Sequence, residues 1–122
     1  MTETLTKLSW GMLALIHALP AAALFRPALL ARLYGIDASG DLGVLMAHRA
    51  ALFFAVAAVC VYAAFDPGAR RAAGLVTAIS VAGFLVLYAG AGWPGGGLRG
   101  IAIGDAVAML PLIWVVWAAW RR

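Results

Sequence analysis

Four long apolar runs alternate with short, more polar breaks along the 122-residue chain. The runs lie near residues 8–25, 42–65, 72–91 and 98–120. Each run is close to the roughly 20 residues that an α-helix needs to cross a bilayer. The pattern therefore predicts an all-α fold, a transmembrane four-helix bundle in which residues 1–122 form a single domain. Because two of the three connections are short, we expect successive helices to run antiparallel and touch.

The longest break, RPALLARLYGIDASGD, covers residues 26–41. Pro27 suits the first turn of a helix. Three leucines would share one face of that helix: Leu29, Leu30 and Leu33. Arg32 would lie near the opposite side. We expect a short helix that lies in the membrane interface between the first and second spans, with Tyr34 as its aromatic anchor.

The composition agrees with a membrane protein and narrows its partners. Hydrophobic residues make up 66% of the chain and charged residues 11%, far from the soluble average. The net charge of +4 is spread over helix ends and connections, without the basic stripe that nucleic acid requires. We therefore expect the lipid bilayer, and no nucleic acid, as a partner. Cys60 is the single cysteine, which excludes an internal disulfide.

The first apolar run admits two interpretations. Lys7 precedes an apolar stretch that ends in PAAALF, which resembles a secretory signal with a small-residue cleavage site. His17 and Pro20 interrupt that stretch, however, and it is long for a signal core. We therefore favour a first helix that is retained as part of the bundle.

Lysine and arginine residues near the helix ends predict the orientation of the bundle, because cytoplasmic connections carry an excess of them. One side carries five such residues: Lys7, Arg70, Arg71, Arg121 and Arg122. The other side carries three: Arg26, Arg32 and Arg99. We therefore expect a multi-pass protein of the bacterial inner membrane with both termini in the cytoplasm. The excess is small, and dual insertion stays open as an alternative.

Ionisable residues in three of the runs fall at a similar depth. At 1.5 Å per residue, Arg49 and Asp105 lie about 10 Å, and His17 about 12 Å, from the outer ends of their helices. A charge near a helix centre costs about 2.5 to 3.5 kcal/mol, so Arg49 and Asp105 kept apart could cost on the order of 5 kcal/mol. We therefore expect a buried Arg49–Asp105 ion pair across the bundle.

This polar layer has a structural and a functional interpretation. The ion pair could fix the helix register and do nothing else. Alternatively, the pair and His17 or His48 could line a pocket for a proton, a lipid headgroup or a small ligand. His48 is rotated about 100° from Arg49 on the helix, so we expect it to turn toward the first or third span. We expect no metal, because Arg49 would repel a cation there.

Small residues recur every four positions at the start of the last run, at Gly100, Gly104 and Ala108. Such a face lets another helix backbone approach closely. We favour helix packing within the chain over a homodimer contact, and a membrane-protein partner stays open.

No catalytic or nucleotide-binding motif is visible in the sequence. The segment GWPGGGLRG lacks a Walker-type Gly-Lys-Ser/Thr ending, and it lies between apolar runs rather than between a strand and a helix. We therefore expect a non-enzymatic accessory or ligand- or lipid-binding bundle without a cofactor. The alternative is a small dimeric proton-coupled transporter that uses Asp105, although an arginine partner would oppose protonation of this residue.

Three segments give the chain a family resemblance: ARLYGID at residues 31–37, LMAHRAALFF at residues 45–54 and GDAVAML at residues 104–110. Their order resembles that of the DoxX-like group of small four-helix bacterial membrane proteins. The resemblance implies a four-helix bundle with a polar layer. In some relatives it also implies association with membrane redox enzymes that act on sulfur compounds or quinones. DoxX proteins carry basic residues in the first helix, whereas this chain has His17 there.

Overall fold

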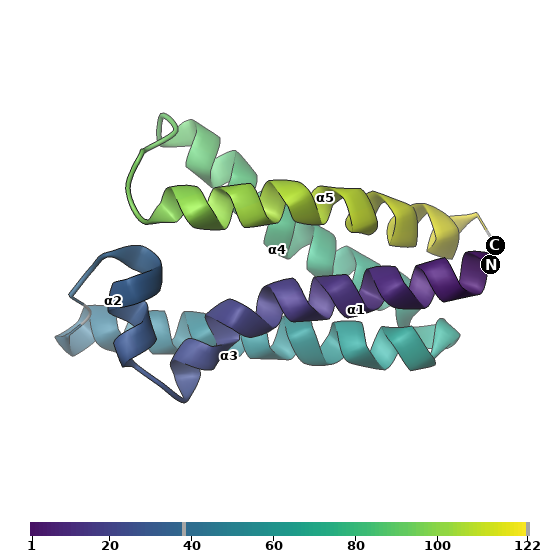
Figure 1. Ribbon diagram of the computed structural model, residues 1–122, viewed down its shortest axis with the longest axis horizontal. Helices are drawn as coiled ribbons and strands as arrows, with labels where there is room; N and C mark the ends of the chain where they lie inside the picture. The colour runs from purple at the N-terminus through teal and green to yellow at the C-terminus, as the bar shows by residue number, and fades with distance from the viewer. Residues whose placement is uncertain (38, 122) are drawn as a thin grey trace.

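The computed structural model describes residues 1–37 and 39–121, so Arg122, which contributes to the predicted orientation, lies outside the described residues. The described part is helical and contains no strand, which confirms the predicted all-α bundle (Figure 1). The α-helices are α1 (Thr2–Ala21), α2 (Ala28–Tyr34), α3 (Gly40–Phe65), α4 (Arg70–Gly90) and α5 (Leu98–Trp120). Two short 3₁₀ turns accompany them, η1 (Ala22–Leu24) and η2 (Pro67–Ala69).

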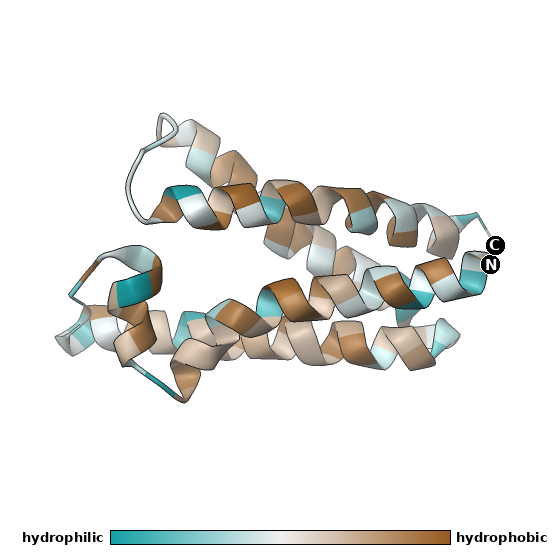
Figure 2. Cartoon of the chain, in the orientation of Figure 1, coloured by the Kyte–Doolittle hydropathy of each residue, from teal (hydrophilic) through white to brown (hydrophobic). Residues whose placement is uncertain are grey.

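Four of these helical segments are long and apolar enough to cross a membrane: Thr2–Leu24, Gly40–Phe65, Pro67–Gly90 and Leu98–Trp120. Figure 2 shows brown and pale colours along most of their length, with teal at helix ends, on α2 and in short bands within α1 and α5. Their length and composition support a multi-pass membrane protein. The start of α1 and the end of α5 lie side by side at one end of the bundle (Figure 1), as four spans require.

The first helix begins at Thr2, earlier than the apolar run predicts, because its polar first turns are paired inside the bundle. Thr6 and Ser9 are buried. The Thr6 hydroxyl donates a hydrogen bond to the Thr2 carbonyl oxygen at 2.8 Å and accepts one from Trp114 Nε1 at 3.2 Å. Hydropathy alone misses such turns, because it counts threonine and serine as polar without seeing their partners.

The main core lies toward the terminal end of the bundle, by which we mean the end that holds both chain termini. Its fully buried side chains come from all four spans: Trp10, Leu13, Cys60, Val81 and Val115. A smaller cluster at the opposite end joins η1, α2 and α3 through Ala23, Leu30, Tyr34 and Ala50. We call this opposite end the α2 end. Figure 1 shows α2 lying across it, between α5 and the pair formed by α1 and α3.

The short helix between the first two spans forms as predicted, but the expected role of Tyr34 is wrong. Tyr34 has an exposed fraction of 5%, and its ring lies 5.4 Å from the Arg49 guanidinium carbon. The tyrosine therefore packs inside the α2 end instead of anchoring α2 in the lipid headgroups. Gly35, with a φ of 65°, ends α2 in a left-handed conformation that glycine adopts easily.

The approach of α2 to α5 depends on Gly97, the residue before α5. A Cβ at this position would overlap the backbone carbonyl group of Tyr34. The neighbouring Gly95 and Gly96 have open space in the same direction. The sequence alone does not distinguish these three glycines. The structure does, because Gly97 faces the Tyr34 backbone and the other two face open space.

We expect Gly97→Ala to lower the free energy of unfolding by about 1 to 3 kcal/mol, because the added methyl group must displace α2 from α5. Thermal unfolding in detergent, followed by circular dichroism, measures this effect. Gly96→Ala is the matched control in the same connection, and we expect it to cost much less. Equal losses in the two variants would contradict a close approach at Gly97.

Candidate functional site

The predicted polar layer contains a cavity of about 610 Å³ between α1, α2 and α5. We call it the Asp105 cavity. Its walls are largely apolar, and its volume is typical of sites for small amphipathic ligands. Charged, aromatic and small residues of the lining include His17, Arg32, Phe53, Gly100, Gly104 and Asp105. The layer at the α2 end is therefore hollow rather than packed shut.

Asp105 is the most unusual residue of this cavity. Its exposed fraction is 5%, and it has neither a salt bridge nor a hydrogen bond to any of the described residues. Among the described residues, Trp10 Nε1 is the side-chain polar atom that is fully buried and has no hydrogen-bond partner. The oxygens of Asp105 also have no partner in this part of the chain, but they are not fully buried. The Asp105 carboxyl group is therefore unpaired yet reachable from the cavity. An unpaired carboxylate in apolar surroundings favours a ligand that donates a hydrogen bond, or a proton.

His17 lines the same cavity as Asp105. Its ring is almost fully buried, with an exposed fraction of 1%. Nδ1 lies 2.8 Å from the Leu13 carbonyl oxygen, and Nδ1 must be the donor because a carbonyl can accept but not donate. In the neutral ring, Nε2 then accepts from the Ser80 hydroxyl at 3.5 Å. These bonds fix the orientation of the ring as part of the cavity wall.

The predicted ion pair between Arg49 and Asp105 is not formed. Neither residue takes part in a salt bridge within the described chain. The Arg49 guanidinium carbon instead lies over three aromatic rings, at 4.7 Å from the centre of Phe53, 5.4 Å from Tyr34 and 5.5 Å from Phe84. These rings come from α3, α2 and α4. Arg49 and Asp105 were expected to pair because they lie at a similar depth, but depth along a helix does not reveal the aromatic rings that surround Arg49.

Tyr34 connects the two separated charges electrostatically. Burial raises the pKa of the Tyr34 hydroxyl above its ordinary value, the positive charge of Arg49 lowers this pKa, and Asp105 raises it. Tyr34 belongs to α2, which lies outside the membrane spans, and the pKa of its hydroxyl responds to both charges. Arg49 and Asp105 are thus near one hydroxyl without contacting each other.

His48 does not turn into the bundle, so its expected orientation is wrong. The side chain is exposed, whereas the next residue, Arg49, is half-buried under the aromatic rings. The rotation of about 100° between neighbours explains the difference, because α3 can direct one of the two inward but not both. His48 is therefore not part of the Asp105 cavity.

The expected close packing at Gly100 and Gly104 is also absent among the residues that the structure describes. A Cβ at either position would meet no atom within 4 Å, and both glycines line the Asp105 cavity. Ala108, one turn further along, is fully buried in the main core. Gly100 and Gly104 therefore leave open space at the α2 end, whereas Ala108 allows close packing one turn deeper in the bundle. A homodimer contact through these glycines stays a prediction.

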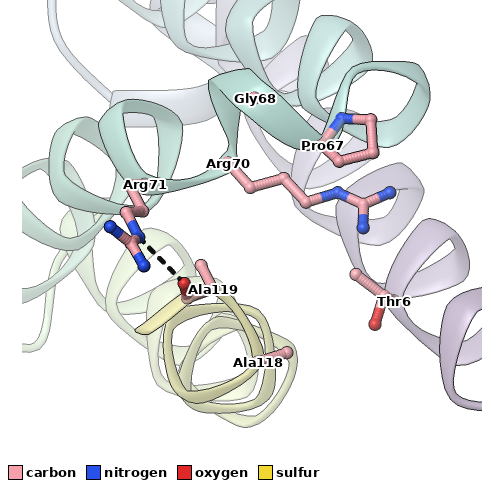
Figure 3. A pocket seen from close by; sticks show the side chains of 7 residues that line it. All are labelled: Thr6, Pro67, Gly68, Arg70, Arg71, Ala118 and Ala119. Atoms are coloured by element: carbon pink, nitrogen blue, oxygen red, sulfur yellow. Dashed lines mark hydrogen bonds between the residues drawn. The ribbon is translucent and has the colours of Figure 1, made fainter. Parts of the chain in front are cut away.

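A second pocket, of about 390 Å³, lies at the terminal end (Figure 3). Arg70 and Arg71 border it, and Arg71 Nε donates to the Ala119 carbonyl oxygen at 3.1 Å. Arg70 is buried and forms two hydrogen bonds to the Glu3 carboxylate, at 2.7 and 3.0 Å. Sequence reasoning missed Glu3, because this residue precedes the first apolar run. The sequence did contain a signal for this pair, because Glu3 is an acidic residue expected at the same end of the bundle as Arg70.

The described residues contain no group of three or more His, Cys, Asp or Glu side chains placed to hold a metal ion. No protein-family model, curated protein or solved structure matches this chain.

Proposed function

We propose that this chain is a small non-enzymatic membrane protein that binds an amphipathic small molecule in the Asp105 cavity. The unpaired, buried Asp105 carboxyl group facing a cavity of about 610 Å³ carries this proposal. Apolar walls suit the body of such a ligand, and a polar group on the ligand would satisfy Asp105. Arg32 lies on the interfacial helix and borders the same cavity, where it contacts the part of the ligand nearest the headgroups.

The proposed setting is the inner membrane of a bacterium, with both termini in the cytoplasm. The excess of basic residues on the terminal side supports this orientation. The resemblance to DoxX-like proteins supports an accessory role beside another membrane protein. In this arrangement the Asp105 cavity lies in the outer half of the bilayer.

Proton-coupled transport by a dimer is the second candidate function. One observation favours it: Asp105 forms no salt bridge with any of the described residues. Asp105→Asn tests the candidate, because an amide cannot carry a proton through a transport cycle. Cells that express this variant should lose proton-coupled uptake or drug resistance conferred by the native protein. Retained transport would eliminate this candidate while leaving ligand binding intact.

Filling the cavity tests the ligand-binding function. We expect Gly104→Leu to fold, because a Cβ there meets open space, and to place its side chain in the Asp105 cavity. Native mass spectrometry of protein purified in mild detergent measures small-molecule adducts. The wild-type protein should carry an adduct of a few hundred daltons that the variant loses.

Gly11→Leu is the matched control for this experiment. A Cβ on Gly11 also meets no atom within 4 Å, and this glycine borders a different groove, between α1 and α3. The control should keep the adduct. Retention of the adduct by Gly104→Leu, or its loss from both variants, would contradict a ligand in the Asp105 cavity.

A further inference from the structure

A separate groove of about 680 Å³ runs between α3 and α4. We call it the Arg49 groove. Arg49 borders it near the α2 end, and apolar residues that include Leu52, Val76 and Ile79 form much of the rest. These three side chains are exposed, with exposed fractions of 43% or more, so the groove opens sideways toward the surrounding lipid. Ser80 and Gly83 also line it.

Arg49 borders this groove and forms no salt bridge with any of the described residues. Its contacts with the described residues are the three aromatic faces, and it forms no hydrogen bond with them. A guanidinium group packed on aromatic faces keeps its five N–H donors free at its edges. These donors match a phosphate group, which can accept two parallel hydrogen bonds from one arginine.

We propose that an anionic membrane phospholipid binds in the Arg49 groove, with its phosphate on Arg49 and an acyl chain along the apolar wall. Charge and depth both support this occupant. A 26-residue helix is about 39 Å long, longer than the roughly 30 Å hydrocarbon core. Arg49 follows the start of α3 by only nine residues, which is close enough to the helix end for a lipid phosphate to meet a long arginine side chain.

This lipid site is distinct from the Asp105 cavity and does not depend on its proposed ligand. Phe53 borders both spaces, and His17 and Ser80 are hydrogen-bonded to each other from opposite sides. Phe53, His17 and Ser80 together form a wall between the two spaces. The Asp105 cavity presents a carboxyl group on one side of this wall, and the Arg49 groove presents a guanidinium group on the other. The two charges can therefore select two different partners.

Delipidated protein titrated with phosphatidylglycerol, with native mass spectrometry as the readout, tests the proposal. The wild-type protein should bind phosphatidylglycerol more tightly than phosphatidylcholine, and Arg49→Gln should weaken phosphatidylglycerol binding about tenfold. Arg26→Gln is the matched control, because it removes the same charge from an exposed position at the same end of the bundle. Equal weakening by the two variants would show general attraction to the membrane surface and overturn the proposal.

A second pair of variants tests the groove without changing charge. Gly83→Leu adds a side chain to the Arg49 groove at a position where a Cβ meets no atom within 4 Å. We expect it to weaken phosphatidylglycerol binding, whereas Gly104→Leu in the Asp105 cavity should leave this binding unchanged. Normal lipid binding by Gly83→Leu would overturn the proposed position of the acyl chain. Weakening by Gly104→Leu alone would assign the lipid to the Asp105 cavity and overturn a separate site.

Discussion

Arg70→Met is expected to lower the free energy of unfolding by about 1 to 3 kcal/mol, because it leaves a buried carbonyl oxygen without its donor and breaks an ion pair in which the Glu3 side chain is 44% exposed. The Arg70 side chain is buried and donates through Nε to the Ala63 carbonyl oxygen at 2.9 Å, in addition to its two bonds to Glu3. Methionine keeps much of the volume but leaves these oxygens without their donor. Denaturation of the protein in mixed detergent micelles measures the loss.

Arg71→Met is the matched control for this prediction. Arg71 is the next residue and carries the same charge, but its side chain is exposed, whereas that of Arg70 is buried. We expect a much smaller loss of stability. If the two variants unfold at the same denaturant concentration, the contribution assigned to the Arg70–Glu3 pair is wrong.

The two ends of the bundle have different physical designs. Arg70 joins the start of α1, the end of α3 and the start of α4 at the terminal end, above a core of fully buried side chains. At the α2 end, the Asp105 cavity and the Arg49 groove replace such packing. Concentrating stability at one end leaves the other end free to hold unpaired polar groups. Binding sites often break the rules of stable packing in this way.

Hydropathy predicted the four spans because lipid imposes a simple requirement on length and composition. The depth argument brought His17 and Asp105 to one layer, and they line one cavity. It could not predict the partner of Arg49, because depth along a helix does not specify rotation about its axis or the positions of aromatic rings from other elements. Gly97 was equally hidden, since its importance comes from the Tyr34 backbone that it faces.

Asp105→Leu is expected to stabilise the bundle by on the order of 2 kcal/mol while it abolishes ligand binding in the Asp105 cavity. A carboxyl group near a helix centre costs about 2.5 to 3.5 kcal/mol in the bilayer, and here the described residues give it no hydrogen bond or salt bridge in return. Leucine removes this cost and can occupy part of the cavity. Unfolding in mixed micelles and native mass spectrometry measure the two effects on the same preparation.

The sign of the stability change distinguishes a binding site from a structural ion pair. If Asp105 paired with Arg49 in the membrane, removing the acid would leave a buried cation alone and would cost about 3 to 5 kcal/mol. Ala106→Leu is a control that adds the same side chain at the next, exposed position. A gain specific to Asp105→Leu, together with loss of the adduct, means that the native aspartate is kept for its ligand at the expense of stability. Destabilisation by Asp105→Leu would indicate that Asp105 pairs with Arg49 in the membrane and would contradict the proposed binding site.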